Sequence, residues 1–409
     1  CPDAAALTSL VGEIITEFDE GVENVEVQLL NDGEVARTGR DGSYNFDYLI
    51  VGETMELDPK LDIDHLNGVS TFDLVLMQKH ILGYDELDSP YKLIAADINR
   101  SGSITAIDIV EARRLILGYY DNFPDNESWR FVPEGYNFAD PSRPFDFPEV
   151  LEIGLQEGAS VDFTGIKIGD VNESNTPHSL MSSTIRSVGT LTFSIDDREV
   201  QVGEEVMIEV RSEDFADVAG YQFTLEAAGM ELTGIQAGAL PVDESHFGIF
   251  DGYLTTSFNR IDVGQASEEA LFTLTFRSEV SARLSEVLRI SSRITRAEAY
   301  RSGGDHLDIA LTFDDPNPRP DTRDPQLLQN RPNPFDQKTT IGFYLPEQTK
   351  AVLTIHDVAG KVIKRIEGEY VAGYHQLEVS KTEIQAVGVL YYTLETDEFR
   401  ATKKMVVLE

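Results

Sequence analysis

Apolar and polar residues alternate in three separate parts of the chain, as they do in β-strands that bury one face. The first part is residues 8–58, where clusters of Asn, Asp and Gly mark turns between short strands. The second part is residues 190–313, and the third begins at residue 326. This pattern predicts a mainly β protein that contains three β-sandwich modules.

A helical pattern occurs twice between residues 62 and 118. Each copy is a short polar loop, then apolar residues at helical spacing, then a glycine, Gly83 in the first copy and Gly118 in the second. We expect two helices that pack antiparallel against each other. Residues 121–178 are aromatic and rich in Pro and Asp, too apolar for a disordered linker. We expect an irregular segment there, with a few strands packed on the preceding modules.

The second polar loop has oxygen-bearing residues at the spacing that one loop needs to wrap around a Ca²⁺ ion. Gly102 stands at position 6 of this loop, where a sharp turn is required. An Asx-rich turn that only caps a helix would not require oxygens at the third and fifth positions. The expected calcium ligands are Asp97, Asn99, Ser101, Ser103 through its backbone carbonyl, and Asp108 at position 12.

The first polar loop follows the same spacing with fewer side-chain oxygens. Its expected ligands are Asp62, Asp64, Leu66, Gly68 and Asp73. Leu66 stands at position 5 without a side-chain oxygen, so this loop would rely on backbone carbonyls, Asn67 or water. We therefore predict that it binds Ca²⁺ more weakly than the second loop. His65, at position 4, is expected to point outward.

A third stretch, Asp170-Val171-Asn172-Glu173-Ser174, looks like the first half of a calcium loop. It lacks the closing acid that Asp108 supplies to the second loop from the first turn of its helix. We favour the simpler interpretation, a polar loop that leads into the Ser/Thr-rich linker at 174–188.

The two complete loops and their helices resemble a bacterial type I dockerin, which has two calcium loops of EF-hand type, each with only its exit helix. The first loop departs from the family, because Asn67-Gly68 stands where Asp-Gly is usual. The resemblance implies Ca²⁺ as the bound ion. In dockerins the two residues before each position-12 acid face the cohesin, and here they are Thr71-Phe72 and Ala106-Ile107.

The first two β-modules also carry family-like patterns. Residues 21–27 read Gly-Val-x-x-Val-x-Val and residues 41–46 read Asp-Gly-x-Tyr-x-Phe, which is similar to the transthyretin-like (carboxypeptidase regulatory-like) sandwich of extracellular proteins. Residues 202–206 and 218–225 resemble a cohesin-like jelly roll, in which a glycine–aromatic strand follows the first pair of strands. Both resemblances imply a fold and say little about activity.

The final module begins with Leu-Gln-Asn-Arg-Pro-Asn-Pro-Phe at 328–335 and ends with Lys-Lys-Met-Val-Val at 403–407. These residues are similar to the type A C-terminal sorting domain of the type IX secretion system of Bacteroidota, although Leu390 stands where tyrosine is usual. The resemblance implies that residues 326–409 bind the type IX secretion machinery. The alternative is a small Ig-like sandwich with no export role.

Phe72 and Ile107, if exposed, would each leave apolar area in water at roughly 1.5–3 kcal/mol relative to burial. A soluble module seldom leaves such a pair uncovered. The available cover within the chain is residues 121–178, the first sandwich or the cohesin-like sandwich. We favour the first two, because they are nearest in sequence and closing a short loop costs little entropy. The alternative is self-association, in which the cohesin-like sandwich of one copy clasps the dockerin-like helices of another, head to tail.

Composition narrows the classes of partner. The chain has 72 acidic and 33 basic residues and a formal net charge of −39. Such a surface repels nucleic acid and anionic lipid and favours divalent cations. No apolar run approaches the ~20 residues of a membrane span. Cys1 is the only cysteine; we expect it to mark where a fragment begins rather than an acylated first residue.

The sequence offers no catalytic constellation. Its seven histidines form no His-x-x-x-His pair, and it has no Gly-x-Ser-x-Gly motif and no Gly-rich phosphate loop. Paired carboxylates are frequent, but in a chain this acidic they are expected on any solvated face. We therefore expect no enzymatic activity from these residues.

Together these patterns predict the non-catalytic C-terminal part of a large secreted structural or adhesive protein, stabilised by calcium and located outside the cell or on its outer surface. The alternative is the accessory region of a secreted polysaccharide-degrading enzyme whose catalytic domain lies upstream. The expected modules are a transthyretin-like sandwich (1–60), a dockerin-like pair (61–120), an irregular segment (121–185), a cohesin-like sandwich (186–315), a linker (316–325) and a sorting domain (326–409).

Overall fold

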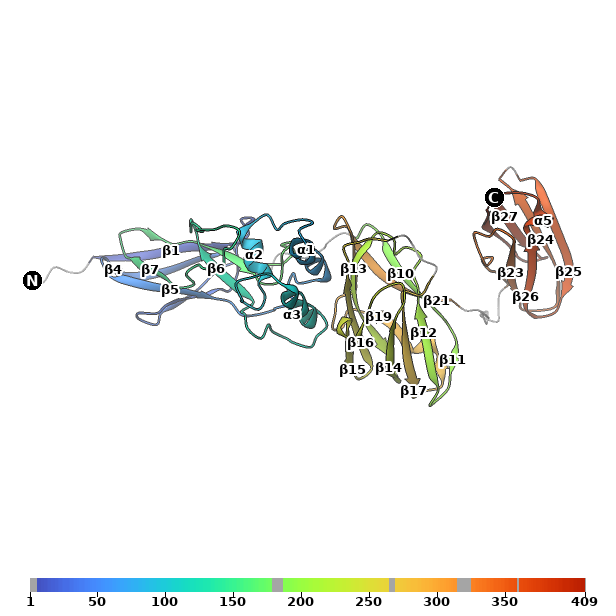
Figure 1. Ribbon diagram of the computed structural model, residues 1–409, viewed down its shortest axis with the longest axis horizontal. Coiled ribbons are helices and arrows are strands. Elements are labelled where there is room, and N and C mark those ends of the chain that lie inside the picture. Colours follow the sequence, from blue (N-terminus) through green and yellow to red (C-terminus); the bar gives the residue numbers. More distant parts are fainter. Residues whose placement is uncertain (1–5, 179–186, 265–268, 315–324, 359, 409) are drawn as a thin grey trace, which may run out of the picture. The chain divides into compact units, whose positions relative to one another are not determined.

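The protein folds into two compact units, Cys1–Asp314 and Asp315–Glu409. The computed structural model describes residues 6–178, 187–264, 269–314, 325–358 and 360–408 (Figure 1). The fold is mainly β, with several sheets and few helices, as the alternating pattern predicts. None of the helices in these described ranges has both the length and the apolar character that a membrane span requires.

The first sandwich draws its strands from both sides of the helical region in the sequence. They are β1 (Leu7–Ile15), β2 (Glu26–Leu29), β3 (Val35–Arg37), β4 (Ser43–Ile50), β5 (Thr54–Lys60), β6 (Trp129–Pro133), β7 (Leu151–Gly154), β8 (Ala159–Ser160) and β9 (Phe163–Lys167). One sheet has the order β4-β1-β9-β6, with β8 also paired to β1, and the other has the order β3-β2-β5-β7. The sandwich is therefore not confined to residues 1–60, because Trp129, Phe131 and Phe163 complete its core.

Three helices lie between these strands in the sequence: α1 (Thr71–Ile81), α2 (Pro90–Ala96) and α3 (Ala106–Ile116). Helices α1 and α3 are the two that the apolar spacing predicts, and they contact each other. Helix α2 is additional, and its seven residues are too few to show a helical period. Buried side chains of the segment 121–178 share the helical core, namely Phe123, Val132, Phe147, Ile166, Ile168 and Val171.

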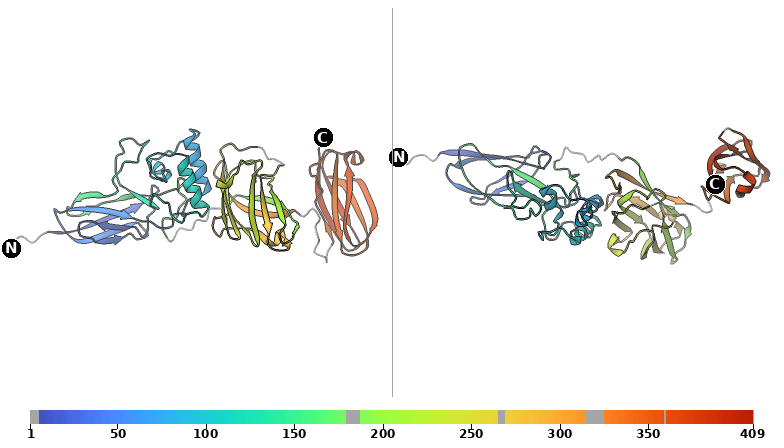
Figure 2. Two further views of the ribbon diagram at one scale, coloured as in Figure 1. Left: turned by 60° about the horizontal axis from the view of Figure 1, so that its bottom comes forward. Right: turned by 45° about the horizontal axis from the view of Figure 1, so that its top comes forward.

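The second sandwich occupies the rest of the first unit, and Figure 2 shows its strands in two layers. Its elements are β10 (Thr190–Asp196), β11 (Glu199–Val200), β12 (Glu205–Val210), β13 (Val218–Ala227), β14 (Met230–Ala237), a 3₁₀ turn (Glu244–His246), β15 (Phe247–Phe250), β16 (Tyr253–Asn259), β17 (Phe272–Ser278), β18 (Ala282–Arg283), α4 (Leu284–Val287), β19 (Leu288–Ser291), β20 (Glu298–Arg301) and β21 (His306–Asp314). The larger sheet has the order β10-β21-β20-β13-β16-β15, with β19 also on β13, and β12-β17-β14 forms the opposing sheet. Phe193, Tyr221 and Phe272 lie in the core between them.

The second unit is a smaller sandwich with its own core, which includes Phe335, Phe343 and Tyr392. Its elements are β22 (Gln326–Leu327), β23 (Lys338–Leu345), β24 (Thr349–Asp357), β25 (Val362–Tyr370), β26 (Gly373–Ser380), α5 (Lys381–Ile384), β27 (Gly388–Glu395) and β28 (Arg400–Val407). The sheets have the orders β22-β23-β26 and β25-β24-β27-β28. These strands thus form a β-module with a core of its own.

We predict that Phe131→Ala destabilises the first sandwich by about 3–5 kcal/mol, because it removes a large buried side chain from the core. Urea unfolding followed by the fluorescence of Trp129, the only tryptophan, measures this loss. The control is Tyr48→Ala, since Tyr48 is 83% exposed on β4. If the two variants unfold at the same urea concentration, strand β6 is not part of this core.

Candidate calcium loops and the contact face of the helices

The second predicted loop brings its expected ligands together at the start of helix α3. The carboxylate of Asp97 accepts hydrogen bonds from the amides of Ser101 (2.8 Å) and Gly102 (2.8 Å). Asn99 Oδ1 also accepts from the Ser101 amide, at 3.1 Å. Asp108 Oδ1 accepts from the Asn99 amide at 3.1 Å, so the position-12 acid lies beside position 3. The Ser101 hydroxyl donates to the Ser103 carbonyl at 3.2 Å.

The donors of this loop fit a calcium ion. They are two carboxylates, an amide oxygen, a hydroxyl and a backbone carbonyl, and a hard cation prefers such oxygen ligands. Asp97 is 1% exposed and Asp108 is fully buried. Burial raises the pKa of the Asp97 carboxyl, because water no longer solvates its charge, although amide hydrogen bonds oppose the shift. A bound cation would compensate the charge of both carboxylates.

The first predicted loop is arranged differently. Asp62 Oδ1 accepts a hydrogen bond from the Ser128 amide at 2.8 Å and lies 2.8 Å from His65 Nε2. His65 is 2% exposed, and its Nδ1 accepts from the Phe123 amide at 3.1 Å. The expectation that His65 points outward is therefore wrong, because its ring packs against Phe123 in the core. Asp62 thus connects the loop to the residues that lead into β6.

Asp73, the closing acid of the first loop, faces a different segment. It is fully buried, and one of its oxygens accepts from the Ser70 amide at 2.8 Å as part of the helix cap. Its other oxygen accepts from the amides of Val171 (2.9 Å) and Asn172 (3.2 Å). Burial, and to a smaller extent the charge of Asp170, raises the pKa of Asp73 well above its ordinary value.

The remaining expected ligands of the first loop are spread over this region. Asp64 has a backbone φ of 48°, and Leu66 is 39% exposed. Gly68 has a φ of 78°, in the left-handed region that favours glycine. The Gly68 carbonyl accepts a hydrogen bond from the Ser174 hydroxyl at 3.0 Å. The structure therefore brings Gly68 and Asp73 to the segment 170–175, whereas Asp62 bonds to Ser128.

Helix α1 begins against the larger sheet of the second sandwich. The amide and hydroxyl of Thr71 donate to Gln222 Oε1, at 2.6 and 2.8 Å. The Thr71 hydroxyl also lies 2.7 Å from the Ser257 hydroxyl. All three residues are at most 3% exposed. The backbone comes this close because position 220 is glycine, where a Cβ atom would lie 2.9 Å from Thr71 Cγ2.

Phe72 is covered by the second sandwich as well. Its ring stacks on Tyr300 of β20, with ring centroids 5.2 Å apart and planes inclined by 24°. The expectation that residues 121–178 or the first sandwich cover Phe72 is therefore wrong. Buried side chains of residues 121–178 pack on the apolar stripe of the helices, whereas Thr71 and Phe72 are in contact with the second sandwich. Ile107, the corresponding residue of α3, is 59% exposed.

The C-terminal end of helix α3 also contacts the second sandwich. The last carbonyls of a helix have no hydrogen-bond partner within the helix. At the end of α3, two threonine hydroxyls donate hydrogen bonds to two of these carbonyls. Thr295 donates to the Ile116 carbonyl at 2.6 Å, and Thr255 donates to the Leu117 carbonyl at 2.7 Å. Earlier in the helix, Arg113 donates to Asn259 Oδ1, and burial lowers the pKa of this guanidinium to about 10. The larger sheet of the second sandwich, together with the segment between β19 and β20, thus contacts the start of α1 and the end of α3.

A comparison with models of known protein families gives a match to the helical region. The family model of the dockerin type I domain matches residues 60–117, which contain α1, α2 and α3. The dockerin prediction is thereby confirmed for this part of the chain. A comparison with curated proteins found no match.

Several solved structures are similar to a stretch of the chain. One is the sixth cohesin of scaffoldin B from Acetivibrio cellulolyticus in complex with a mutant Cel5 dockerin, with 20% identity over 30% of this chain and 94% of that chain, and a TM-score of 0.25. Another is a non-cellulosomal cohesin from Archaeoglobus fulgidus, with 15% identity over 30% of this chain and 86% of that chain, and a TM-score of 0.23. Similarities this low carry no argument about function.

We predict that Asp108→Ala removes one bound Ca²⁺ ion per chain, because it deletes the carboxylate that closes the second loop. Isothermal titration calorimetry of the chelator-treated protein counts the ions. The matched control is Asp125→Ala, which removes the same charge from an exposed position nearby. Unchanged stoichiometry in Asp108→Ala would show that the second loop holds no calcium.

Proposed function

We infer that this chain is a non-catalytic, calcium-stabilised part of a secreted surface protein, in which the second sandwich occupies the partner face of the dockerin domain within the same molecule. Thr71 carries this inference. It belongs to the residue pair that faces the cohesin in dockerins, and it is fully buried against Gln222 and Ser257. A face used in this way is not free to bind a separate protein. The dockerin domain then joins two sandwiches.

The chemistry of the contact supports a permanent interface. Its hydrogen bonds lie in the interior, and each contributes about 0.5–1.5 kcal/mol net relative to bonds with water. Separation would expose Phe72 and Tyr300 and would leave the end of α3 without the caps from Thr255 and Thr295. These losses fall on both helices at once. The contact would therefore resist separation far better than a weak docking surface.

Two features support a location outside the cell, namely the second unit and the expected calcium ion. The resemblance of residues 326–409 to a type IX sorting domain supports export, and the separate core of this unit allows it to fold independently of the cargo. Extracellular calcium modules bind with dissociation constants of about 10⁻⁴–10⁻³ M, so the ion would load after export. We propose that the exported chain has no catalytic role and that it binds and supports neighbouring modules.

An engineered disulfide distinguishes internal docking from association between copies. We predict that Thr71→Cys with Ser257→Cys, in a Cys1→Ser background, forms a cross-link within one molecule, because the two hydroxyls lie 2.7 Å apart. Non-reducing gels and thiol titration should show a monomer without free thiols at every protein concentration. The control pair, Ile107→Cys with Ser257→Cys, should keep its thiols. A disulfide-linked dimer that grows with concentration would contradict internal docking and support the clasp between copies.

Export gives an independent prediction. We predict that residues 316–409, fused to a periplasmic reporter in a type IX-competent cell, direct the reporter out of the cell. A matched fusion of residues 187–314 should stay in the periplasm, because it lacks the sorting-domain motifs at 328–335 and 403–407. Retention of both fusions would remove the export role from the proposal and leave the internal docking unaffected.

A further inference from the structure

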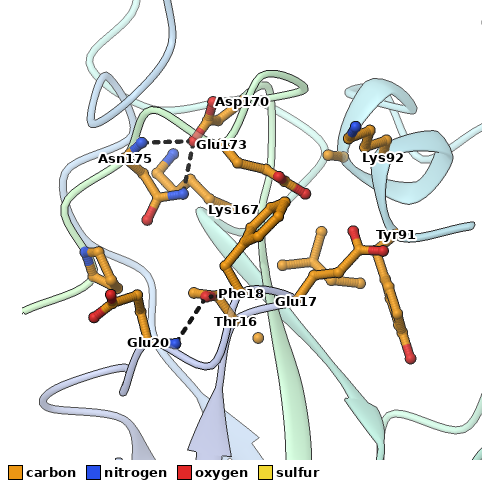
Figure 3. Close-up of a pocket in the computed structure, with 14 residues that line it drawn as sticks. Thr16, Glu17, Phe18, Glu20, Tyr91, Lys92, Lys167, Asp170, Glu173 and Asn175 are labelled. Atoms are coloured by element: carbon orange, nitrogen blue, oxygen red, sulfur yellow. Dashed lines mark hydrogen bonds between the residues drawn. The ribbon is translucent and has the colours of Figure 1, made fainter. Parts of the chain in front are cut away.

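The segment that follows β9 repeats the arrangement of the second calcium loop. The carboxylate of Asp170 accepts from the amides of Ser174 (3.0 Å) and Asn175 (2.9 Å), as Asp97 accepts from Ser101 and Gly102. Figure 3 shows the two hydrogen bonds that Asn175 donates to Asp170. Asn172 Oδ1 accepts from the Ser174 amide at 3.2 Å, which matches the bond from the Ser101 amide to Asn99.

The backbone agrees with this correspondence. The residue at the fourth position has positive φ in both segments, 60° at Glu173 and 54° at Arg100. Neither residue is glycine, and left-handed backbone is uncommon for such side chains. Residues 170–174 therefore correspond to loop positions 1 to 5, whereas the sixth position differs, because Gly102 has a φ of 77° and Asn175 does not have positive φ. What they lack within their own stretch of sequence is the second half of a loop, with its carbonyl and its closing acid.

Residues of the first predicted loop supply that second half. Asp73 Oδ1 accepts from the Asn172 amide at 3.2 Å, as Asp108 Oδ1 accepts from the Asn99 amide at 3.1 Å. The Ser174 hydroxyl donates to the Gly68 carbonyl at 3.0 Å, as the Ser101 hydroxyl donates to the Ser103 carbonyl at 3.2 Å. Gly68 precedes Asp73 by five residues, and Ser103 precedes Asp108 by five residues. Positions 7 and 12 are thus both filled.

The close approach of the two segments depends on a glycine. A Cβ atom at position 68 would lie 2.5 Å from Asp170 Oδ2 and 2.8 Å from the Asn175 Cα atom. Asp73 is fully buried and Asp170 is 3% exposed, so two carboxylates are held together away from water. The nearby ammonium of Lys167 donates to the carbonyls of His65 (2.8 Å) and Ile168 (3.2 Å) instead. A divalent cation between the carboxylates would compensate their charge.

We propose that the first calcium ion of the dockerin domain is held by a loop assembled from two separate segments: Asp170, Asn172 and Ser174 from one, and the Gly68 carbonyl and Asp73 from the other. Asp62 and Asp64 are not ligands of this ion. The proposal deepens the calcium part of the proposed function and rests on it. It also replaces the expectation of a weak first site, because Ser174 supplies at position 5 the hydroxyl that Leu66 lacks.

The ion would join parts of the chain that are far apart in the sequence. Val171 and Asp73 are separated by 98 residues, and the rest of α1, helices α2 and α3 and strands β6 to β9 lie between them. A divalent ion that binds both segments in the folded chain, and does not bind the unfolded chain, stabilises the contact between them. Calcium would therefore fix the first sandwich, through β9, to the start of helix α1.

Calcium titration of the full chain tests the assignment. The wild-type protein, freed of metal by chelator, should bind two Ca²⁺ ions in isothermal titration calorimetry. Asp170→Asn, which keeps the volume and one oxygen, should weaken one site at least tenfold. The matched control, Asp62→Asn with Asp64→Asn, should bind both ions with wild-type affinity. Loss of one ion in the control together with two intact sites in Asp170→Asn would overturn the proposal.

Hydrogen exchange locates the effect independently of the ion count. Calcium should slow exchange at residues 170–175 in the wild-type chain and in the Asp62→Asn, Asp64→Asn control, but not in Asp170→Asn. Circular dichroism at saturating calcium checks that each variant is folded. A wild-type chain that binds no Ca²⁺ would overturn both this proposal and the calcium part of the proposed function. The internal docking would remain, because the cysteine pair at positions 71 and 257 tests it without calcium.

Discussion

In the first turn of helix α1, Asp73 accepts hydrogen bonds from the amides of Val171 and Asn172, while Thr71 bonds to Gln222. These two side chains, two residues apart, contact opposite neighbours. One neighbour continues from strand β9 of the first sandwich, and the other belongs to β13 of the second. Both side chains are fully buried, so removing either one leaves polar groups without partners and without water. The position of the helix therefore sets the positions of both.

The same acid closes an ion shell and caps a helix. In α1 the cap is Ser70 with Asp73, and in α3 it is Thr105 with Asp108. Because the carboxylate that would bind calcium also accepts the amide of the capping residue, ion binding and the start of the helix are coupled. Loss of calcium would loosen the first turn of α1, which is the turn that contacts the second sandwich. The ion and the internal docking would then act together to make one rigid unit.

Much of this arrangement could be predicted from local sequence. The spacing of Asp97, Asn99 and Asp108 predicts a loop, and in the structure Asp108 lies beside Asn99. The apolar stripes predict helices α1 and α3. The partners of Phe72 and Asp73 could not be predicted in this way. Proximity in sequence favoured residues 121–178 as the cover, but their apolar side chains are already used on the helical core.

The half-loop at 170–174 was visible in the sequence, but its closing acid was not, because nothing local indicates that Asp73 lies beside it. Anomalous diffraction from crystals grown with calcium tests the assembled site most directly, since each ion gives its own peak. The account predicts one peak between Asp97 and Asp108 and a second between Asp73 and Asp170. A second peak beside Asp62 and Asp64, with none near Asp170, would contradict it.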